Sequence, residues 1–367
     1  MSVREARVTR LSMSAPDDVA PLEAAFAAGR MDPHAIRAVF AKTEGNGCVN
    51  DFTRAFAVQS VLACLARHGV TDAAERVALV MSGGTEGALS PHWLVIEAID
   101  SEAPMREGAL AIGVAHTPTL RPEDIGRMAQ VDAVADAVAS AMADAGIAHA
   151  DDVHFVQVKC PLVTSERVAE AAARGAAVRT ADTLKSMGVS RGAAALGVAV
   201  ALGEVAHGAL SDETIGGDLS VFSGRASTSA GVELMNNEVV VLGRSDAWAG
   251  SLTIESGVMA DAIDVEPVRA ILERQGLMAA GRLVPGAEAN IVALLAKAEP
   301  SPTGRLRGFR HTMLDDSDIS ATRHARGFVA GALAGVVGHA ELFVSGGAEH
   351  QGPPGGGPVA LITRRPA

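Results

Sequence analysis

A motif of the form Ser-small-Gly-x-Glu occurs three times in this chain and constrains the fold more than any other feature. The copies are Ser82-Gly83-Gly84-Thr85-Glu86, Ser229-Ala230-Gly231-Val232-Glu233 and Ser345-Gly346-Gly347-Ala348-Glu349. A single copy would carry no information, because glycine-rich turns are common. Three copies with the same serine-to-glutamate offset indicate an internal repeat, and an internal repeat determines the architecture of the whole chain.

The residues that precede each copy repeat as well, in the order lysine, arginine, serine. The three sets are Lys42, Arg54, Ser82; Lys159, Arg191, Ser229; and Lys297, Arg323, Ser345. Each third of the chain reads as a strand, a helix, a strand ending in lysine, a helix carrying arginine, and the serine motif. This order predicts an α/β protein of three repeat units, bounded by the polar segments near 100–104 and 250–251, as 1–104, 105–254 and 255–367.

Local patterns predict the main helices and strands of each unit. Helical spacing of apolar residues predicts a helix from Asp51 to His68 with Asn50 or Asp51 as its cap. Further helices are expected from Pro122 to Ala145, from Ser190 to about Ala206 and from Ser320 to Val337. Strands are expected at 77–81, 109–116, 151–158, 258–264, 289–296, 341–344 and 359–363, whereas 93–99 fits a strand or a short helix.

Composition excludes several classes of protein. Apolar residues make up 48% and charged residues 20%, which is typical of a globular chain. The net charge of -12 argues against nucleic acid as a general partner. Three cysteines without a CxxC pair indicate a reducing compartment. No long apolar run predicts a membrane span, and the segment from Met1 to Arg7 lacks the pattern of a signal peptide, so we expect a cytoplasmic protein.

The repeated side chains suggest a binding site. If the three units pack around a pseudo-threefold axis, three lysines, three arginines and three serines converge there. Such a site is rich in hydrogen-bond donors and suits a flat ligand with several carbonyl oxygens. Serine needs a base to act as a nucleophile, and no Ser-His-Asp order repeats in the chain. A lysine can be that base where burial and neighbouring cations lower its pKa.

One Lys-Ser pair differs from the other two. Lys42 and Lys297 are each followed two residues later by a glutamate, which would hold the ammonium charged, whereas Lys159 has Pro161 at that place. This difference favours Lys159 as the base and Ser229 as the nucleophile. Ser223 and Ser227 are rival serines nearby, and the repeated offset to glutamate selects Ser229 over them.

The repeated segments resemble the cyanuric acid hydrolase and barbiturase family. The resemblance extends over nearly the whole chain and is carried by 42–47, 82–87 and 345–353. It implies three α/β units around a pseudo-threefold axis with sheets inside and helices outside, homotetramers, and ring opening of a cyclic ureide. It assigns Ser229 as the nucleophile and Lys159 as the base. The substrate contacts it implies are Arg54, Arg191, Arg323, Ser82, Gly83, Ser229, Ala230, Ser345 and Gly346, with Lys42 and Lys297 beside them.

The resemblance also implies a structural divalent cation, usually magnesium, and no organic cofactor. Its side-chain ligand would be Glu299, and carbonyl ligands would come from Ala348, Gln351, Gly352, Pro353 and Gly356. Cyanuric acid is the expected substrate, and carboxybiuret, which decays to biuret and carbon dioxide, is the expected product. Ring opening of barbituric acid and non-catalytic binding of a small ligand stay open as alternatives. A metal-dependent amidohydrolase is disfavoured because no histidine pair has ligand spacing.

Overall fold

Three sheets of the same topology form the centre of the protein. The computed structural model describes residues 3–365, so Met1, Ser2, Pro366 and Ala367 lie outside the described residues. The sheet orders are β3-β2-β4-β1-β9, β7-β6-β8-β5 and β16-β13-β17-β10. Each therefore places the four strands of a unit in the spatial order third, second, fourth, first. A register shift also recurs near the start of the second strand in all three.

The first unit contains β1 (Val3–Ser12), α1 (Ala20–Ala27), β2 (Ile36–Thr43), α2 (Phe52–Arg67), α3 (Ala73–Arg76), β3 (Ala78–Gly83) and β4 (His92–Ser101). The second contains β5 (Ala109–His116), α4 (Met128–Ala145), β6 (Val153–Pro161), α5 (Ser165–Ala173), α6 (Thr183–Ala201), β7 (Ala226–Gly231), β8 (Glu238–Ser245) and β9 (Trp248–Ala249). The third contains β10 (Leu252–Met259), α7 (Glu266–Arg274), β13 (Ile291–Ala298), α8 (Ala321–Val337), β16 (Phe343–Gly346) and β17 (Gly357–Arg364). Two small hairpins, β11–β12 (Met278–Ala279, Arg282–Leu283) and β14–β15 (Arg305–Leu306, Phe309–Arg310), extend the third unit.

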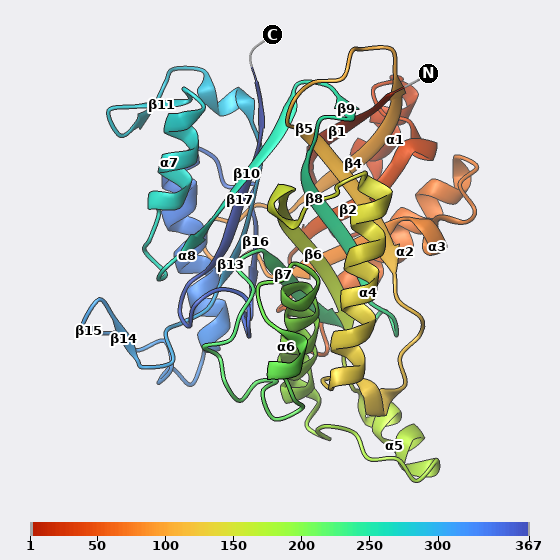
Figure 1. The fold of residues 1–367 in the computed structure, drawn as a ribbon, viewed down its shortest axis with the longest axis vertical. Helices are drawn as coiled ribbons and strands as arrows, with labels where there is room; N and C mark the ends of the chain where they lie inside the picture. Colours follow the sequence, from red (N-terminus) through yellow and green to blue (C-terminus); the bar gives the residue numbers. More distant parts are fainter. Residues whose placement is uncertain (1–2, 366–367) are drawn as a thin grey trace.

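The helices lie outside the sheets (Figure 1). Alternate residues of a strand face opposite sides of its sheet. In β2, Phe40 belongs to a core shared by all three sheets, whereas Val39 packs in a separate core with α1 and α2. The rings of Phe40 and Phe343, from the first and third sheets, are 5.3 Å apart. The sheets thus pack against one another through their inner faces, as the repeat predicts.

Several expected element bounds are wrong. A 3₁₀ turn occupies Pro122–Asp124, so α4 begins only at Met128. Helix α6 begins at Thr183, because the Asp182 side chain caps it, and Arg191 therefore lies inside the helix. Segment 260–264 is not a strand, and 93–99 is part of β4. Asp51 caps α2 as expected.

The two expected unit boundaries differ in where they fall relative to the strands. The boundary near 104 lies between β4 and β5, whereas the one at 254/255 lies inside β10. Strand β9 is the last strand of the second unit but pairs with β1 of the first. Among residues 3–365, no helix is long and apolar enough to cross a membrane.

Candidate active site

Each repeated lysine lies directly opposite its repeated serine on a neighbouring parallel strand. The register pairs are Lys42 with Ser82, Lys159 with Ser229, and Lys297 with Ser345. Because strand side chains alternate, Lys42 shares the inner face with Phe40, and Ser345 shares it with Phe343. The pairs expected from the sequence therefore converge where the three sheets meet.

The three lysines are fully buried but bond differently. Lys42 Nζ donates to Ser82 Oγ at 3.2 Å. Lys297 Nζ donates to Ser345 Oγ at 3.0 Å, to the carbonyl of Thr228 at 2.8 Å and to that of Gly346 at 3.2 Å.

The middle pair departs from this pattern. Lys159 Nζ donates to the carbonyl of Met81 at 2.6 Å and forms an ion pair with Glu233 at 2.8 Å. The hydroxyl of Ser229 has no hydrogen-bond partner among the described residues.

Burial changes the acidity of all three ammonium groups. It lowers the pKa of Lys42 well below its ordinary value, with a further lowering from the guanidinium of Arg326. It lowers the pKa of Lys297 to about 7, aided by Arg191. It also lowers the pKa of Lys159, although the carboxylate of Glu233 opposes this change. The cause is that a charged group is disfavoured away from water. Each lysine is thereby a better base at neutral pH than an exposed one.

The glutamate of each serine motif pairs with an arginine from another unit. Glu349 accepts two hydrogen bonds from Arg191, at 2.6 and 2.8 Å. Glu86 accepts from both Arg323 and Arg326. Glu233 lies 3.9 Å from Arg54. The glutamates of the third, first and second units thus contact arginines of the second, third and first units, respectively. Together these contacts form a closed ring around the pseudo-threefold axis.

The third arginine on the central cavity is Arg326, not the expected Arg323. Arg326 is one helical turn after Arg323 in α8 and is buried, whereas the Arg323 side chain is 37% exposed and lines an outer pocket. The corresponding positions in the other units are Ala57 and Ala194, so the repeat gave no signal for Arg326. The substrate contact of Arg323 stays a prediction.

The sequence also misjudged the environment of Lys159. Glu44 is exposed, and Glu299 accepts the backbone N–H of Ala348 at 3.1 Å. Neither carboxylate forms an ion pair with its neighbouring lysine among the described contacts. Lys159, expected to lack a carboxylate, is instead the lysine that has one. The expectation failed because spacing along a strand places residue i+2 on the same face but not within bonding distance.

A small central cavity lies above the lysines. It is lined by Arg54, Ser82, Gly83, Arg191, Ser229, Ala230, Arg326, Ser345 and Gly346, together with Gly47, Met81 and Met187. Its free volume is about 20 Å³, room for about one water molecule. An outer pocket of about 470 Å³ shares Gly47, Met187, Arg191 and Arg326 with it. The central cavity is therefore too small for an organic ring unless side chains around it move.

Three of the expected cation ligands, Glu299, Ala348 and Gly352, line a separate pocket of about 230 Å³. Burial, together with the neighbouring Glu349 carboxylate, raises the pKa of Glu299 to about 7. The backbone is tightly turned here, with φ of +85° at Gly352. The Gln351 side chain accepts the N–H of Thr228 at 2.6 Å, which connects this loop to the strand that carries Ser229.

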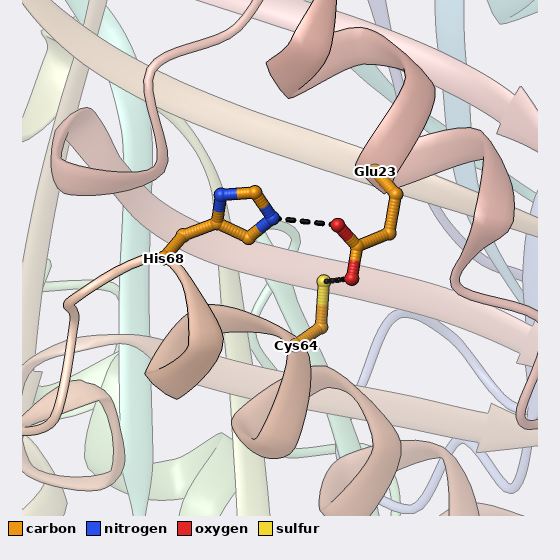
Figure 2. Close-up of side chains that lie close together, drawn as sticks. All are labelled: Glu23, Cys64 and His68. Atoms are coloured by element: carbon orange, nitrogen blue, oxygen red, sulfur yellow. Dashed lines mark hydrogen bonds and ion pairs between the residues drawn. The ribbon is translucent and has the colours of Figure 1, made fainter.

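A second cluster of possible metal ligands lies away from the central cavity, between α1 and α2. Figure 2 shows Glu23 between Cys64 and His68. Arg67 also donates to Glu23, at 2.7 Å, and burial raises the pKa of the Cys64 thiol to about 12. The cluster is thus a network of hydrogen bonds and ion pairs that fastens α1 to α2.

Comparison with known proteins finds one family and several similar sequences that extend over nearly the whole chain. Residues 7–364 match the family described as amidohydrolase ring-opening protein. The chain is 62% identical over 360 residues to the cyanuric acid amidohydrolase of Azorhizobium caulinodans, covering 98% of both chains. It is 50% identical to that of Pseudomonas sp. strain ADP, covering 97% of this chain and 98% of the other.

Solved structures give the same result. The crystal structure of the A. caulinodans hydrolase covers 99% of this chain and all of its own, with a TM-score of 0.92 and 61% identity. A second cyanuric acid hydrolase, described as an evolutionary innovation by structural concatenation, covers the same shares with a TM-score of 0.93 and 49% identity. The concatenation agrees with the three like sheets.

Proposed function

Because the chain belongs to the family of ring-opening amidohydrolases, we propose that it hydrolyses cyanuric acid by opening the ring at one C–N bond. The observation that carries the proposal is the threefold set of Lys-Ser pairs, held in the same register on three sheets. Cyanuric acid is flat and threefold symmetric, with three carbonyl groups and three ring N–H groups. A site that presents the same donors three times matches a ring that presents the same acceptors three times.

The proposed nucleophile is Ser229, with Lys159 as its base. Supporting this choice, Ser229 is the most exposed of the three serines, at 8% against 4% for Ser82 and 1% for Ser345. Its hydroxyl oxygen is buried and, unlike those of the other two serines, accepts no bond from its lysine, so no described hydrogen bond has to break before it reacts. The hydroxyls of Ser82 and Ser345 are engaged by Lys42 and Lys297. Those two pairs would bind the remaining carbonyl groups.

The reaction proceeds in two halves. Ser229 Oγ attacks a ring carbonyl carbon while neutral Lys159 takes the hydroxyl proton, and backbone N–H groups beside the serine stabilise the oxyanion. The tetrahedral intermediate collapses, the ring C–N bond breaks, and the Lys159 ammonium protonates the departing nitrogen. Water then attacks the acyl carbon while Lys159 takes its proton, and Lys159 returns that proton to Ser229 Oγ as the acyl–oxygen bond breaks. The product is carboxybiuret, which loses carbon dioxide to give biuret.

We also propose that a divalent cation, magnesium by the chemistry of its ligands, is bound by Glu299 and by carbonyls of the C-terminal loop. The donor set fits: Glu299 is a partly buried carboxyl group beside that of Glu349, and hard oxygen ligands suit such a cation. The carbonyls of Ala348 and Pro353 each accept one turn hydrogen bond and keep a second lone pair. The cation would hold the loop that contacts Thr228. The homotetramer implied by the resemblance and the cytoplasmic location expected from the sequence both stay predictions.

The direct test is turnover. The purified protein is incubated with cyanuric acid and, in parallel, with barbituric acid, and loss of ring absorbance is followed with time. We expect cyanuric acid to be consumed and biuret to accumulate. Consumption of barbituric acid alone would instead make the protein a barbiturase, and consumption of neither would refute the enzymatic proposal.

A further inference from the structure

The middle serine motif differs from its two counterparts in backbone conformation. The parallel ladder of β6 and β7 continues two residues past Ser229, to the pair Pro161 and Gly231. In the other two sheets the ladder ends one residue past the serine, at Gly83 and at Gly346. Strand β7 therefore carries one more paired residue beyond its serine than β3 or β16.

This extension changes the direction in which the motif continues. The third residue of the motif has a left-handed φ in the outer copies, +107° at Gly84 and +79° at Gly347, whereas Gly231 has no such φ. A Cβ at Gly84 or Gly347 would collide with the guanidinium of Arg326 or Arg191. A Cβ at Gly231 would instead collide with the carboxylate of Glu233, at 2.2 Å. The middle glutamate thus folds back over its own strand.

Arg54, the arginine nearest to Glu233 in the ring of contacts, donates its hydrogen bonds to other groups. Arg54 donates to the carbonyl of Cys48 at 2.8 Å and to that of Ala230 at 3.1 Å. Its Nε stays 3.9 Å from Glu233, whereas Arg191 and Arg326 each donate twice to their glutamates. Glu233 is consequently left to Lys159, its partner at 2.8 Å.

We propose that Glu233 is a positioning residue for the reaction: it orients Lys159 and stabilises the ammonium that forms when Lys159 takes the proton of Ser229. The proposal rests on the proposed function and adds a third member to the Ser-Lys pair. Its role corresponds to that of the aspartate in a Ser-His-Asp triad, which orients the base and stabilises its charged form without itself becoming protonated.

The proton balance follows from this arrangement. In the reactive state, Glu233 is a carboxylate and Lys159 a neutral amine. The proton of Ser229 Oγ moves to Lys159 Nζ as the Oγ–C bond forms, so the pair becomes carboxylate and ammonium while a negative charge develops on the attacked carbonyl oxygen. When the C–N bond breaks, the same proton moves from Lys159 to the ring nitrogen. Glu233 keeps its charge throughout, so no further reactant is needed.

Other charged groups around the pair affect its titration. Arg54 lowers the pKa of both members, and Arg167 interacts with Glu233 from α5 while donating to the carbonyl of Val232. Glu238, opposite Lys159 on β8, is a buried carboxyl whose pKa is raised to about 8 by burial. The thiol of Cys160 is the remaining neighbour. All of these stay in place when Glu233 alone is changed, so the change isolates the Lys159–Glu233 pair.

The test compares Glu233→Gln with the matched control Glu86→Gln, the corresponding residue of the first motif, whose described side-chain partners are Arg323 and Arg326. Removing the carboxylate removes the interaction that raises the pKa of Lys159. We therefore expect the acid limb of the kcat profile of Glu233→Gln to move to lower pH, by about one unit or more, and its plateau to fall about 10- to 100-fold. Glu86→Gln should keep the wild-type limb, since it acts on substrate binding through Arg326. Glu233→Asp keeps the charge and should restore most of the limb.

A readout independent of turnover uses the lysine content. The chain has only the lysines Lys42, Lys159, Lys185 and Lys297, so lysine labelled with ¹³C at Cε gives few resonances, and Lys159→Arg assigns the relevant one. We expect Lys159 to titrate at lower pH in Glu233→Gln than in the wild type. If that variant does not fold, Glu233→Asp should show a smaller shift in the same direction. An unmoved resonance and limb, or equal movement in Glu86→Gln, would overturn the proposal. A wild type inert towards cyanuric acid would instead refute the proposed function and leave this titration to decide the electrostatic role.

Discussion

Replacing each repeated serine by alanine tests the proposal that Ser229 is the nucleophile and that Ser82 and Ser345 only bind. Ser229→Ala removes the attacking oxygen, and loss of a catalytic serine costs about 10⁶-fold in kcat where it has been dissected. The ring should still bind to this variant, because its arginines and two of its Lys-Ser pairs remain.

The other two serines should differ from each other by an amount that the hydrogen bonds predict. In Ser82→Ala, Lys42 loses its only side-chain acceptor among the described contacts, and an unsatisfied buried donor costs about 1–3 kcal/mol, or about 5- to 140-fold in kcat/KM. In Ser345→Ala, Lys297 keeps the carbonyls of Thr228 and Gly346, so the loss is one ordinary hydrogen bond, about 0.5–1.5 kcal/mol, or about 2- to 12-fold.

The assay is steady-state hydrolysis of cyanuric acid by the three variants, with calorimetric binding of the ring to Ser229→Ala as the control for folding. The expected order of loss is Ser229→Ala, then Ser82→Ala, then Ser345→Ala. Comparable loss in all three variants, or retention of turnover by Ser229→Ala, would refute the assignment of the middle pair.

Three further predictions concern stability, the cation and the arginines. The pKa of Lys297 is about 7 in the folded protein and about 10.4 when unfolded, so the unfolded state binds more protons between these values and stability should rise with pH there. Between pH 8 and 10, the midpoint temperature of thermal unfolding should rise less steeply with pH in Lys297→Met than in the wild type. An unchanged slope of midpoint against pH would contradict this. Elemental analysis should find a divalent cation in the wild type and none in Glu299→Gln or after chelation. The samples without the cation should unfold at a lower midpoint temperature than the wild type. Arg326→Ala should lower kcat/KM about 10- to 140-fold, the effect of losing a charge-assisted hydrogen bond. Arg323→Ala should have a smaller effect. The reverse order would indicate that Arg323, not Arg326, contacts the substrate.

The repeat made the architecture predictable because it recorded the same physical constraint three times. In each unit the lysine lies at the end of one strand, and the serine lies at the end of the next parallel strand, just before the glycine-rich turn. Both therefore lie at the carboxyl-terminal edge of the sheet, which agrees with the observed register of Lys42 with Ser82. The same reasoning placed Arg54 and Arg191 on the central cavity. The three coincident copies thus placed the Lys-Ser pairs and two of the three arginines, but not the third, where Arg326 lines the cavity instead of Arg323.

Features that break the repeat could not be predicted in this way. Arg326 stands where the other units have alanine, and nothing in its local sequence separates it from an exposed helical arginine. The pairing of Lys159 with Glu233 depends on where a β-ladder stops, which is a tertiary property. Glutamate at the fixed offset was visible in all three motifs, but its partners lie in other units and only the folded chain brings them together.

Breaking the symmetry is a chemical requirement of such a site. A threefold ring held by three equal Lys-Ser pairs would present the same carbonyl to each, and none of the serines would be distinguished as the nucleophile. Lys42 and Lys297 donate to their serines, which leaves those hydroxyls engaged, and only Ser229 is free beside a lysine held by a carboxylate. One additional ladder pair in β7 accompanies this difference, while the three serines keep their common register. Under the proposed assignment, binding uses the full symmetry of the ring, while bond breaking is confined to the one copy in which the backbone departs from it.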